Sequence, residues 1–350
     1  MFGFEKILIP AVKPFLGKRY SRIGSTHSYV QGDRAKAIEA IITEMLPKAK
    51  KVSVPCLCGK NNSKDILLAE IDRWGLPATT VLCTQCGLIR IHPRWDDATY
   101  DRIYRKYFWP LQVGAFDISY DRFNLSVKRA QPFVEYLKSH VDLKGKNILE
   151  IGCSYGAGLY SLKNNGAQLT GYDYDERILK IGKKYTELNL KQGGLQEALK
   201  DGIQFDIIIL RHVLEHFLYP LNEFEKIKLL LRDHGVLFIE VPGIFNLQEV
   251  TYDPLMYFNA FHIFSFSLKN LIRLLNIASF ELVHGDERIF SLWKKKEGSI
   301  KVNWEDEVLV EKIKNYVYRL ESNYRRRHIN ILYPLFNIIL RRKKSNKKVN

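Results

Sequence analysis

Three groups of residues in this 350-residue chain have types and spacings that could support chemistry. The first is a glycine-rich segment at residues 150–158, and Asp173 follows 21 positions after Gly152. The second is a set of four cysteines between residues 56 and 86. The third is a histidine-rich segment after residue 210, with a further histidine at position 262. Each group can act only if the fold brings its members together.

The glycine-rich segment reads EIGCSYGAG and connects an apolar run to a predicted helix. Glycines let the backbone approach a ligand closely, and a helix N-terminus offers unpaired N–H groups. The order G-x-x-x-G-x-G differs from the dinucleotide-binding order G-x-G-x-x-G, which disfavours an NAD-dependent oxidoreductase. It suits a ligand with a carboxylate, an ammonium group and an adenosine. The alternative is a tight turn without a ligand.

Asp173 ends the apolar run that follows this loop. An acid at the tip of the second strand can accept hydrogen bonds from both hydroxyls of a ribose. The distance between Asp173 and the loop in the sequence therefore favours a nucleoside ligand over a purely structural turn.

Apolar runs that alternate with amphipathic segments would position these residues. The predicted strands are 147–151, 167–173, 205–210, 235–242, 280–284 and 288–294. The predicted helices are 175–188, 221–231 and 267–279, the last with Ser267 as its N-cap. This alternation predicts an α/β, doubly wound, mostly parallel sheet, with ligands at the carboxyl ends of the strands.

The segments EIGCSYGAG, GYDYD, FDIIILRHVLEHFLYP and GVLFIEVP, within residues 145–293, resemble the class I S-adenosylmethionine (SAM)-dependent methyltransferase family. The resemblance implies a seven-stranded Rossmann-like sheet whose last strand is antiparallel, and SAM as the cofactor. Asp173 would bind the ribose, Gly194 and Leu195 would lie near the adenine, and His212 would border the cofactor. The full set implied at the cofactor is Glu150, Gly152, Cys153, Ser154, Gly156, Gly158, Asp173, Tyr174, Gly194, Leu195, Arg211 and His212.

A methyl acceptor that carries a hydroxyl usually also needs a general base. The candidates are Glu215, His216 and His262, because histidine has a pKa suited to this role. Glu215 and His216 could instead form a structural hydrogen bond that fixes their loop. Aromatic neighbours of His262, such as Phe261, would form a pocket wall or part of the core.

The four cysteines, Cys56, Cys58, Cys83 and Cys86, form two close pairs. In a chain without signs of secretion, such pairs favour metal ligation over disulfides. Four thiolates can surround one tetrahedral, structural zinc ion. The first pair is C-x-C rather than C-x-x-C, so His92 is an alternative ligand, and four free buried cysteines are the other alternative.

The segment from CLCG to YDRIYRKYF is similar to the small zinc-binding part of bacterial methyltransferases that act on sugars and surface polysaccharides. The resemblance implies a sugar, glycan or lipid-linked saccharide as the acceptor. Sugar C-methyltransferases have Y-H-E-H where this chain has Asn259-Ala260-Phe261-His262, so O-methylation and C-methylation both remain open. RNA as the acceptor, and a non-catalytic binding protein, are the alternative functions.

The net charge is +16, and the last 29 residues contain nine Lys or Arg residues and no acid. Residues 328–340 between the basic clusters are mostly apolar but too short to span a bilayer. This tail would lie on an anionic membrane surface or remain solvated, and Pro334 predicts a break in any helix there. Without a recognisable signal peptide or spanning segment, we expect a cytoplasmic protein, and the basic tail adds the option of a peripheral position at the inner membrane face. The oligomeric state is left open.

These observations predict five parts. Residues 1–51 form a basic N-terminal region, and residues 52–95 form the zinc-binding module. Residues 96–140 form a helical linker on the acceptor side. Residues 141–296 form the SAM-binding domain, and residues 297–350 form a helical basic C-terminal region.

Overall fold

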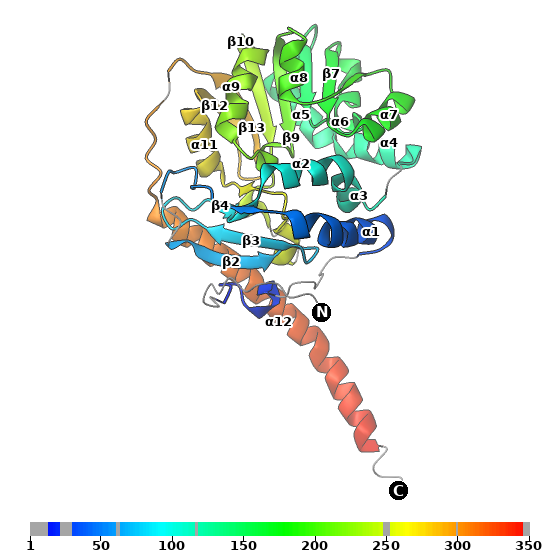
Figure 1. The fold of residues 1–350 in the computed structure, drawn as a ribbon, viewed down its shortest axis with the longest axis vertical. Coiled ribbons are helices and arrows are strands. Elements are labelled where there is room, and N and C mark those ends of the chain that lie inside the picture. Colours follow the sequence, from blue (N-terminus) through cyan, green and yellow to red (C-terminus); the bar gives the residue numbers. More distant parts are fainter. Residues whose placement is uncertain are drawn as a thin grey trace.

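A computed structural model describes residues 13–21, 30–60, 64–115, 118–247, 253–298 and 300–345, with side chains described as far as residue 327. Figure 1 shows a body of sheets and helices, from which the C-terminal helix extends.

The main sheet has seven strands in the order β12-β13-β10-β9-β6-β7-β8. Its strands are β6 (Asn147–Ile151), β7 (Gln168–Asp173), β8 (Asn189–Gln192), β9 (Phe205–Arg211), β10 (Leu231–Glu240), β12 (Phe280–Gly285) and β13 (Phe290–Lys295). Only β13 runs antiparallel to its neighbours, β10 and β12. The predicted fold class and the antiparallel last strand are confirmed.

Helices cover both faces of this sheet because alternate residues of its buried strands point to opposite sides. Ile208 and Leu210 of β9 pack with α8, α9 and α11, whereas Ile207 and Ile209 pack with α5 and α7. The helices of this domain are α5 (Gln131–His140), α6 (Ala157–Tyr160), α7 (Glu176–Tyr185), α8 (Leu195–Lys200), α9 (Pro220–Leu230) and α11 (Leu268–Ile277). Ser267 caps α11 as predicted, because its Oγ accepts the Asn270 N–H at 3.2 Å.

Two details of the predicted sheet differ from the structure. Strand β10 begins at Leu231 rather than at residue 235, and its pairing with β9 shifts register between Leu231 and Val236. The polar residues that suggested a turn therefore lie within an irregular strand. Strand β8 was not predicted, because its sequence NLKQ contains a single apolar residue.

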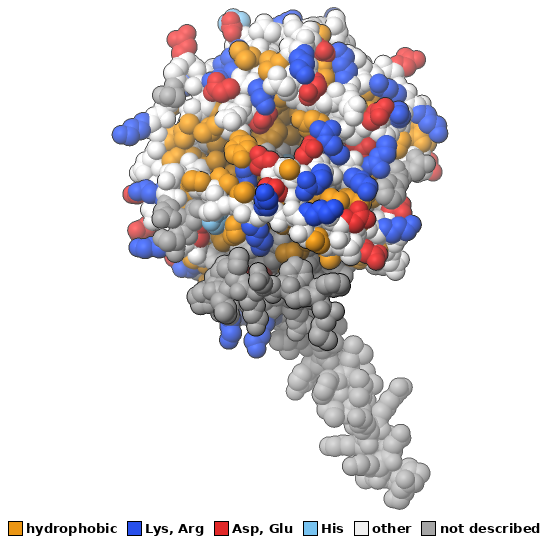
Figure 2. Space-filling view, in the orientation of Figure 1, with side chains coloured by type: hydrophobic (Ala, Val, Ile, Leu, Met, Phe, Trp, Pro, Cys, Tyr) orange, Lys and Arg blue, Asp and Glu red, His pale blue; other side chains and the backbone are white. Residues whose placement is uncertain are grey.

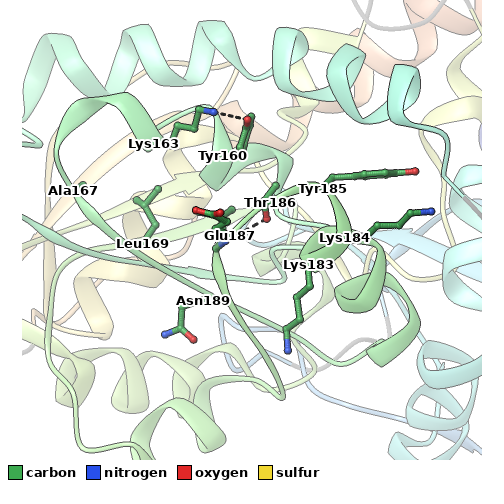
Figure 3. A pocket seen from close by; sticks show the side chains of 11 residues that line it. Tyr160, Lys163, Ala167, Leu169, Lys183, Lys184, Tyr185, Thr186, Glu187 and Asn189 are labelled. Carbon is green, nitrogen blue, oxygen red and sulfur yellow. Dashed lines mark hydrogen bonds between the residues drawn. The ribbon is translucent and has the colours of Figure 1, made fainter.

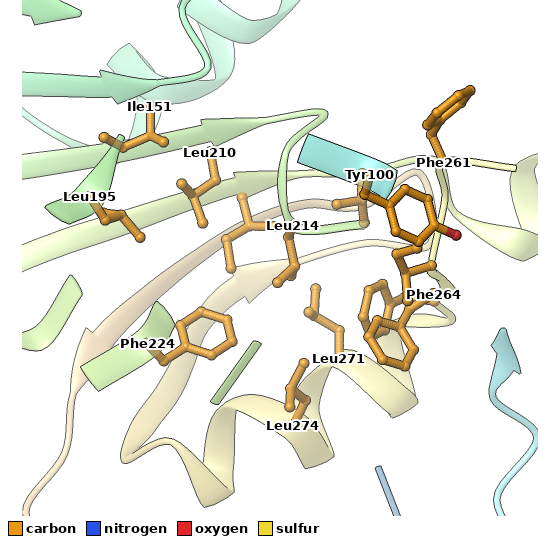
Figure 4. Close-up of a cluster of buried hydrophobic side chains, with 14 of the residues drawn as sticks. Tyr100, Ile151, Leu195, Leu210, Leu214, Phe224, Phe261, Phe264, Leu271 and Leu274 are labelled. Carbon is orange, nitrogen blue, oxygen red and sulfur yellow. The ribbon is translucent and has the colours of Figure 1, made fainter. Parts of the chain in front are cut away.

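The cysteines belong to a second sheet, of order β11-β4-β3-β2. Its strands are β2 (Ile66–Ile71), β3 (Pro77–Leu82), β4 (Ile89–Ile91) and β11 (Phe264–Ser265), and β1 (Lys51–Val52) pairs separately with β5 (Arg94–Trp95). Since β11 lies between β10 and β12 in the sequence, it ties the two sheets together, with Phe264 opposite Arg90. Figure 4 shows Phe261 and Phe264 in the same buried cluster as Leu210 of the main sheet.

Helices between the two sheets cover the edge where the strands of the main sheet end (Figure 1). They are α2 (Asp97–Lys106), α3 (Phe108–Val113) and α4 (Tyr120–Arg129), and α1 (Gly32–Ala40) packs beside α3 and continues as a π-helical turn, η2 (Ile41–Met45). The short 3₁₀ helices are η1 (Lys18–Ser21), η3 (Leu46–Lys48), η5 (Lys163–Asn165), η6 (Leu214–His216), η7 (Ile244–Asn246) and η8 (Pro254–Tyr257).

The last helix, α12 (Glu307–Ser345), begins against the second sheet and then extends away from the body (Figure 1). Its first turns bury Leu309 and Ile313 in a cluster with Leu82 of β3. The predicted break at Pro334 is wrong, because the helix continues through this residue despite the missing backbone donor. Among the described residues, no helix has the length and apolar character to cross a membrane.

Candidate active site

The loop after β6 and the tip of β7 are held together by the Asp173 carboxylate. Its Oδ2 accepts the Ser154 backbone N–H at 2.9 Å, and its Oδ1 accepts the Asp175 N–H at 3.0 Å. Burial raises the pKa of Asp173, and these two backbone donors oppose the rise. Gly152 and Ser154 both adopt positive φ angles, of 67° and 55°, which turn the loop backbone towards the acid. The glycine-rich loop therefore lies opposite the Asp173 carboxylate, as the sequence predicts.

A cavity of about 220 Å³ lies at the carboxyl end of β6 and β9. Residues lining it are Ser126, Arg129, Ala130, Glu150, Gly152, Cys153, Ser154, Tyr155, Ala157, Gly158, Arg211 and His212. Seven of these twelve were predicted at the cofactor. Of the other five, Ser126 and Arg129 come from α4, which carries no recognisable motif. Ser126 Oγ lies 2.7 Å from the Tyr155 hydroxyl, so α4 is hydrogen-bonded to the glycine-rich loop.

Gly158 has no room for a side chain. A Cβ atom there would lie 2.7 Å from Arg211 Nη1 and 3.0 Å from Glu150 Oε1. The glycine therefore allows the start of α6 to pack directly on a charged pair. Gly152 is similarly restricted, because a Cβ atom would lie 2.5 Å from Val213 Cγ2.

Charged residues of alternating sign line the carboxyl edge of the central strands. Arg211 donates from Nε to Glu240 Oε2 at 2.7 Å, and its Nη1 lies 3.9 Å from Glu150 Oε1. His212 Nε2 lies 3.3 Å from Glu240 Oε1. Sequence reasoning missed Glu240, although an acid at the end of the strand VLFIE was a usable signal.

The pKa values along this edge follow from burial and pairing. Burial raises the pKa of Glu150 to about 7, against the effect of Arg211. Desolvation would lower the pKa of His212, but its interactions with the carboxylates of Glu215 and Glu240 raise it to about 10. His212 also has a φ of 54°, a region uncommon for residues other than glycine. The two neighbouring carboxylates therefore favour the protonated form of His212.

Five predicted cofactor residues do not line this cavity: Gly156, Asp173, Tyr174, Gly194 and Leu195. Tyr174 is half exposed, and its ring lies over Gly194, where an added Cβ would be 2.8 Å from Tyr174 Cζ. Leu195 is a core residue that packs with Ile151, as Figure 4 shows. Cys153 does line the cavity, but its side chain packs in the core, which leaves its backbone to meet a ligand.

The three candidate base residues come together. One ligand-type atom from each of Glu215, His216 and His262 lies within 4.8 Å of the others. His216 and His262 rings are 5.0 Å apart in a T-shaped arrangement. Burial lowers the pKa of both histidines, so both are neutral at pH 7. The imidazole of His216 is oriented by the Phe261 carbonyl, which lies 2.8 Å from Nδ1. The alternative of a structural hydrogen bond between Glu215 and His216 does not account for this orientation.

An aromatic wall stands beside these three residues. Tyr104 and Phe108, from α2 and α3, have ring centroids 4.6 Å apart, and both also pack against Phe261 and His216. The Tyr104 hydroxyl lies 2.8 Å from His216 Nδ1. The helices between the two sheets therefore contribute directly to this part of the site.

The four cysteines also come together, at the end of the second sheet. Cys56 and Cys86 sulfurs are 3.6 Å apart, and those of Cys58 and Cys83 are 3.8 Å apart. Zn–S bonds of 2.3 Å in a tetrahedron imply sulfur separations of about 3.8 Å, so the four sulfurs fit one zinc ion. The alternative ligand His92 is not part of this group, and its Nε2 lies 3.5 Å from Ser53 Oγ.

The glycines after each pair shape the two cysteine turns. Gly59 and Gly87 have positive φ angles of 75° and 72°. Each donates its backbone N–H to the carbonyl of the first cysteine of its pair, at 2.8 and 3.0 Å. The C-x-C spacing of the first pair therefore does not prevent convergence.

A larger cavity, of about 700 Å³, lies at the opposite end of the main sheet, where β7 and β8 begin (Figure 3). Lys163, Lys183 and Lys184 are among its lining residues, and none of the predicted site residues is. Figure 2 shows a separate hollow between α8 and α2, with hydrophobic, acidic and basic side chains around it.

Comparison with known proteins gives a match over the main sheet. Residues 120–285 match a family model described as a methyltransferase domain. A ubiquinone biosynthesis O-methyltransferase of Coxiella burnetii is 30% identical over 110 residues, which are 30% of this chain and 47% of that enzyme. A probable S-adenosylmethionine-dependent methyltransferase of Mycolicibacterium smegmatis is 26% identical, over 39% of this chain and 53% of its own. The chain thus spans about half the length of these curated relatives.

Among solved structures, the chain is similar to the 1,6-didemethyltoxoflavin-N1-methyltransferase of Burkholderia thailandensis, at 17% identity and a TM-score of 0.42. That alignment covers 60% of this chain and 96% of the other. Residues 120–285 therefore match a methyltransferase domain, and the strand order and the glycine-rich loop agree with the resemblance to the class I, S-adenosylmethionine-dependent family.

Proposed function

We propose that this chain binds SAM at the carboxyl end of β6 and β7 and transfers its methyl group to a sugar or glycan. The observation that carries the cofactor assignment is the Asp173 carboxylate, which faces the glycine-rich loop and accepts the Ser154 N–H. Each carboxylate oxygen accepts one backbone N–H and retains a lone pair for a ribose hydroxyl.

The cavity suits a ligand with positive charge. Glu150 Oε2 and Ser154 Oγ are buried without a hydrogen-bond partner among the described residues. Unpaired buried polar atoms are unfavourable, and an ammonium group would satisfy both. Glu150 and Glu240 would also attract a sulfonium. SAM supplies an activated methyl group, so the protein mainly has to align the acceptor with it.

The acceptor would enter beside Tyr104 and Phe108, opposite the neutral imidazoles of His216 and His262. Aromatic faces suit the apolar faces of a sugar ring, and a neutral imidazole can accept the proton of a hydroxyl. The similarity of the cysteine-containing segment to that of bacterial sugar methyltransferases supports the same acceptor class.

A second acceptor class follows from the curated relatives, several of which are named ubiquinone biosynthesis O-methyltransferases. The same aromatic wall would accommodate a hydroxylated ring. A nucleic acid is the less favoured acceptor, because the cysteine-containing segment is not markedly rich in Lys or Arg.

We also propose that the cysteines hold one structural zinc ion, since four protein ligands leave no open position. The basic end of the chain would contact anionic lipid at the cytoplasmic face of the membrane, and would bring the site close to a lipid-linked saccharide. Sedimentation with vesicles of phosphatidylglycerol tests this contact. A chain truncated after Arg327 should lose binding, and unchanged binding would remove the membrane proposal.

Calorimetry with SAM, S-adenosylhomocysteine and NAD tests the cofactor assignment. We expect SAM and S-adenosylhomocysteine to bind and NAD not to bind. Methyl-labelled SAM, incubated with nucleotide sugars, glycolipids, hydroxylated aromatics and RNA, then identifies the acceptor. Lack of SAM binding at millimolar concentration would remove the proposal, whereas label in aromatic products alone would replace the sugar with the second acceptor class.

A further inference from the structure

We infer that Glu215, His216 and His262 bind a divalent cation such as Zn²⁺, Fe²⁺ or Co²⁺, separate from the cysteine site. Their ligand atoms lie within 4.8 Å of one another. A cation with bonds of about 2.1 Å holds neighbouring ligand atoms about 3 to 3.5 Å apart, so the side chains need to converge by less than about 2 Å.

Glu215 is the strongest indication of a ligand. It is 1% exposed, and neither of its carboxylate oxygens has a hydrogen-bond partner among the described residues. His212 forms an ion pair with Glu215, but its Nδ1 lies 3.6 Å from Oε1, too far for a good hydrogen bond. A buried carboxylate left in this way is costly, and a cation would satisfy it.

His216 is oriented as a ligand would be. Its Nδ1 lies 2.8 Å from the Phe261 carbonyl, which can only accept, so Nδ1 carries the proton and Nε2 carries the lone pair. Histidines that bind metals commonly donate their second N–H to a backbone carbonyl in this manner. The Tyr104 hydroxyl, also 2.8 Å from Nδ1, further restricts the ring.

Two imidazoles and one carboxylate form a donor set that favours transition-metal ions over Mg²⁺ or Ca²⁺. The arrangement differs from a metalloprotease site, because the first histidine of the H-x-x-x-H pair, His212, pairs with Glu240 instead. Other charged groups that act on the two histidines are His212 and Arg73, both of which oppose their protonation.

A cation with three protein ligands keeps positions open for other ligands. A hydroxyl oxygen of the acceptor could bind there and lose its proton to water, since a bound cation lowers the pKa of a coordinated O–H. The resulting alkoxide would bond to the methyl carbon, while the carbon–sulfur bond breaks and its electron pair returns to sulfur. This second step rests on the proposed function, whereas cation binding itself does not.

Titration with Co²⁺ tests the site. The protein is first loaded with one equivalent of zinc per chain, which the four soft thiolates take up preferentially, so that the cysteines are occupied and the second site is free. We expect one Co²⁺ per chain, with visible d–d absorption and no thiolate charge-transfer band. Glu215→Gln and His262→Ala should each weaken binding at least tenfold. The exposed His234 provides the matched control, and His234→Ala should bind Co²⁺ as the wild type does.

A second measurement does not depend on how well the variants fold. In the wild type, bound Co²⁺ should shift the ring-proton resonances of His216 and His262 and leave that of His234 unchanged. Absence of a cobalt signal other than thiolate bands, or unchanged binding by Glu215→Gln, overturns the inference. SAM binding without Co²⁺ binding would overturn the cation site and leave the proposed function in place. Co²⁺ binding without SAM binding would remove the proposed function and leave the cation site in place.

Discussion

The guanidinium of Arg211 lies between two acids but is much closer to one of them. Its Nε donates to Glu240 at 2.7 Å, whereas its Nη1 is 3.9 Å from Glu150 Oε1. The positive charge of Arg211 therefore offsets little of the cost of burying the Glu150 carboxylate, which is 4% exposed. This asymmetry explains why burial raises the pKa of Glu150 to about 7.

The stability of the protein should depend on pH through Glu150. Burial raises the pKa of Glu150 in the folded protein above its value in the unfolded chain. The contribution of Glu150 to the free energy of unfolding is therefore complete below about pH 4.5 and is lost as the pH rises to about 7. Wild type should lose up to about 3 kcal/mol of unfolding free energy relative to Glu150→Gln over this interval. Urea unfolding of both proteins at several pH values measures the difference, and parallel pH profiles would contradict the assignment.

Gly158→Ala should weaken SAM binding at least tenfold, because the added Cβ would collide with Arg211 and Glu150. Gly202→Ala is the matched control. Its Cβ would contact nothing within 4 Å, and its positive φ of 66° costs only about 1–2 kcal/mol of stability. Calorimetry should find normal SAM affinity in the control. Equal affinity in both variants would mean that the charged pair does not shape the cofactor cavity.

Cys58→Ser should lower the zinc content well below one ion per chain and lower the thermal unfolding temperature. Binding of a structural zinc ion contributes directly to folding, and a serine hydroxyl is a poor substitute for a thiolate. Elemental analysis and thermal melts measure both effects. Cys153→Ala is the control, because Cys153 lies in the core of the main sheet, away from the other four cysteines. Undiminished zinc in Cys58→Ser would disprove the site.

The main sheet could be predicted because its strands carry a strong local signal. The segments NILEI and FDIIIL are continuous apolar runs, as expected for strands buried on both faces, and both became strands. Asp173 was predictable because it ends the next strand after the glycine-rich loop. Strand β8 and the irregular start of β10 lacked this signal.

Contacts between distant segments could not be predicted. β11 consists of only two residues, and it forms a strand because β4 lies beside it. Ser126 and Arg129 reach the cavity only because α4 packs on the loop, and the convergence of Glu215 with His262 depends on a long connection after β10. Such relationships depend on tertiary packing rather than on a local sequence pattern.

The central claim is that Asp173 holds the ribose of SAM against the glycine-rich loop. The most direct test is calorimetric titration of Asp173→Ala with SAM, with the exposed loop residue Asp142→Asn as the control. Losing two charge-assisted hydrogen bonds, each worth about 1.5–3 kcal/mol, should weaken binding by a factor of about 100 or more. Equal SAM affinity in Asp173→Ala and wild type, with both proteins folded, would contradict the account.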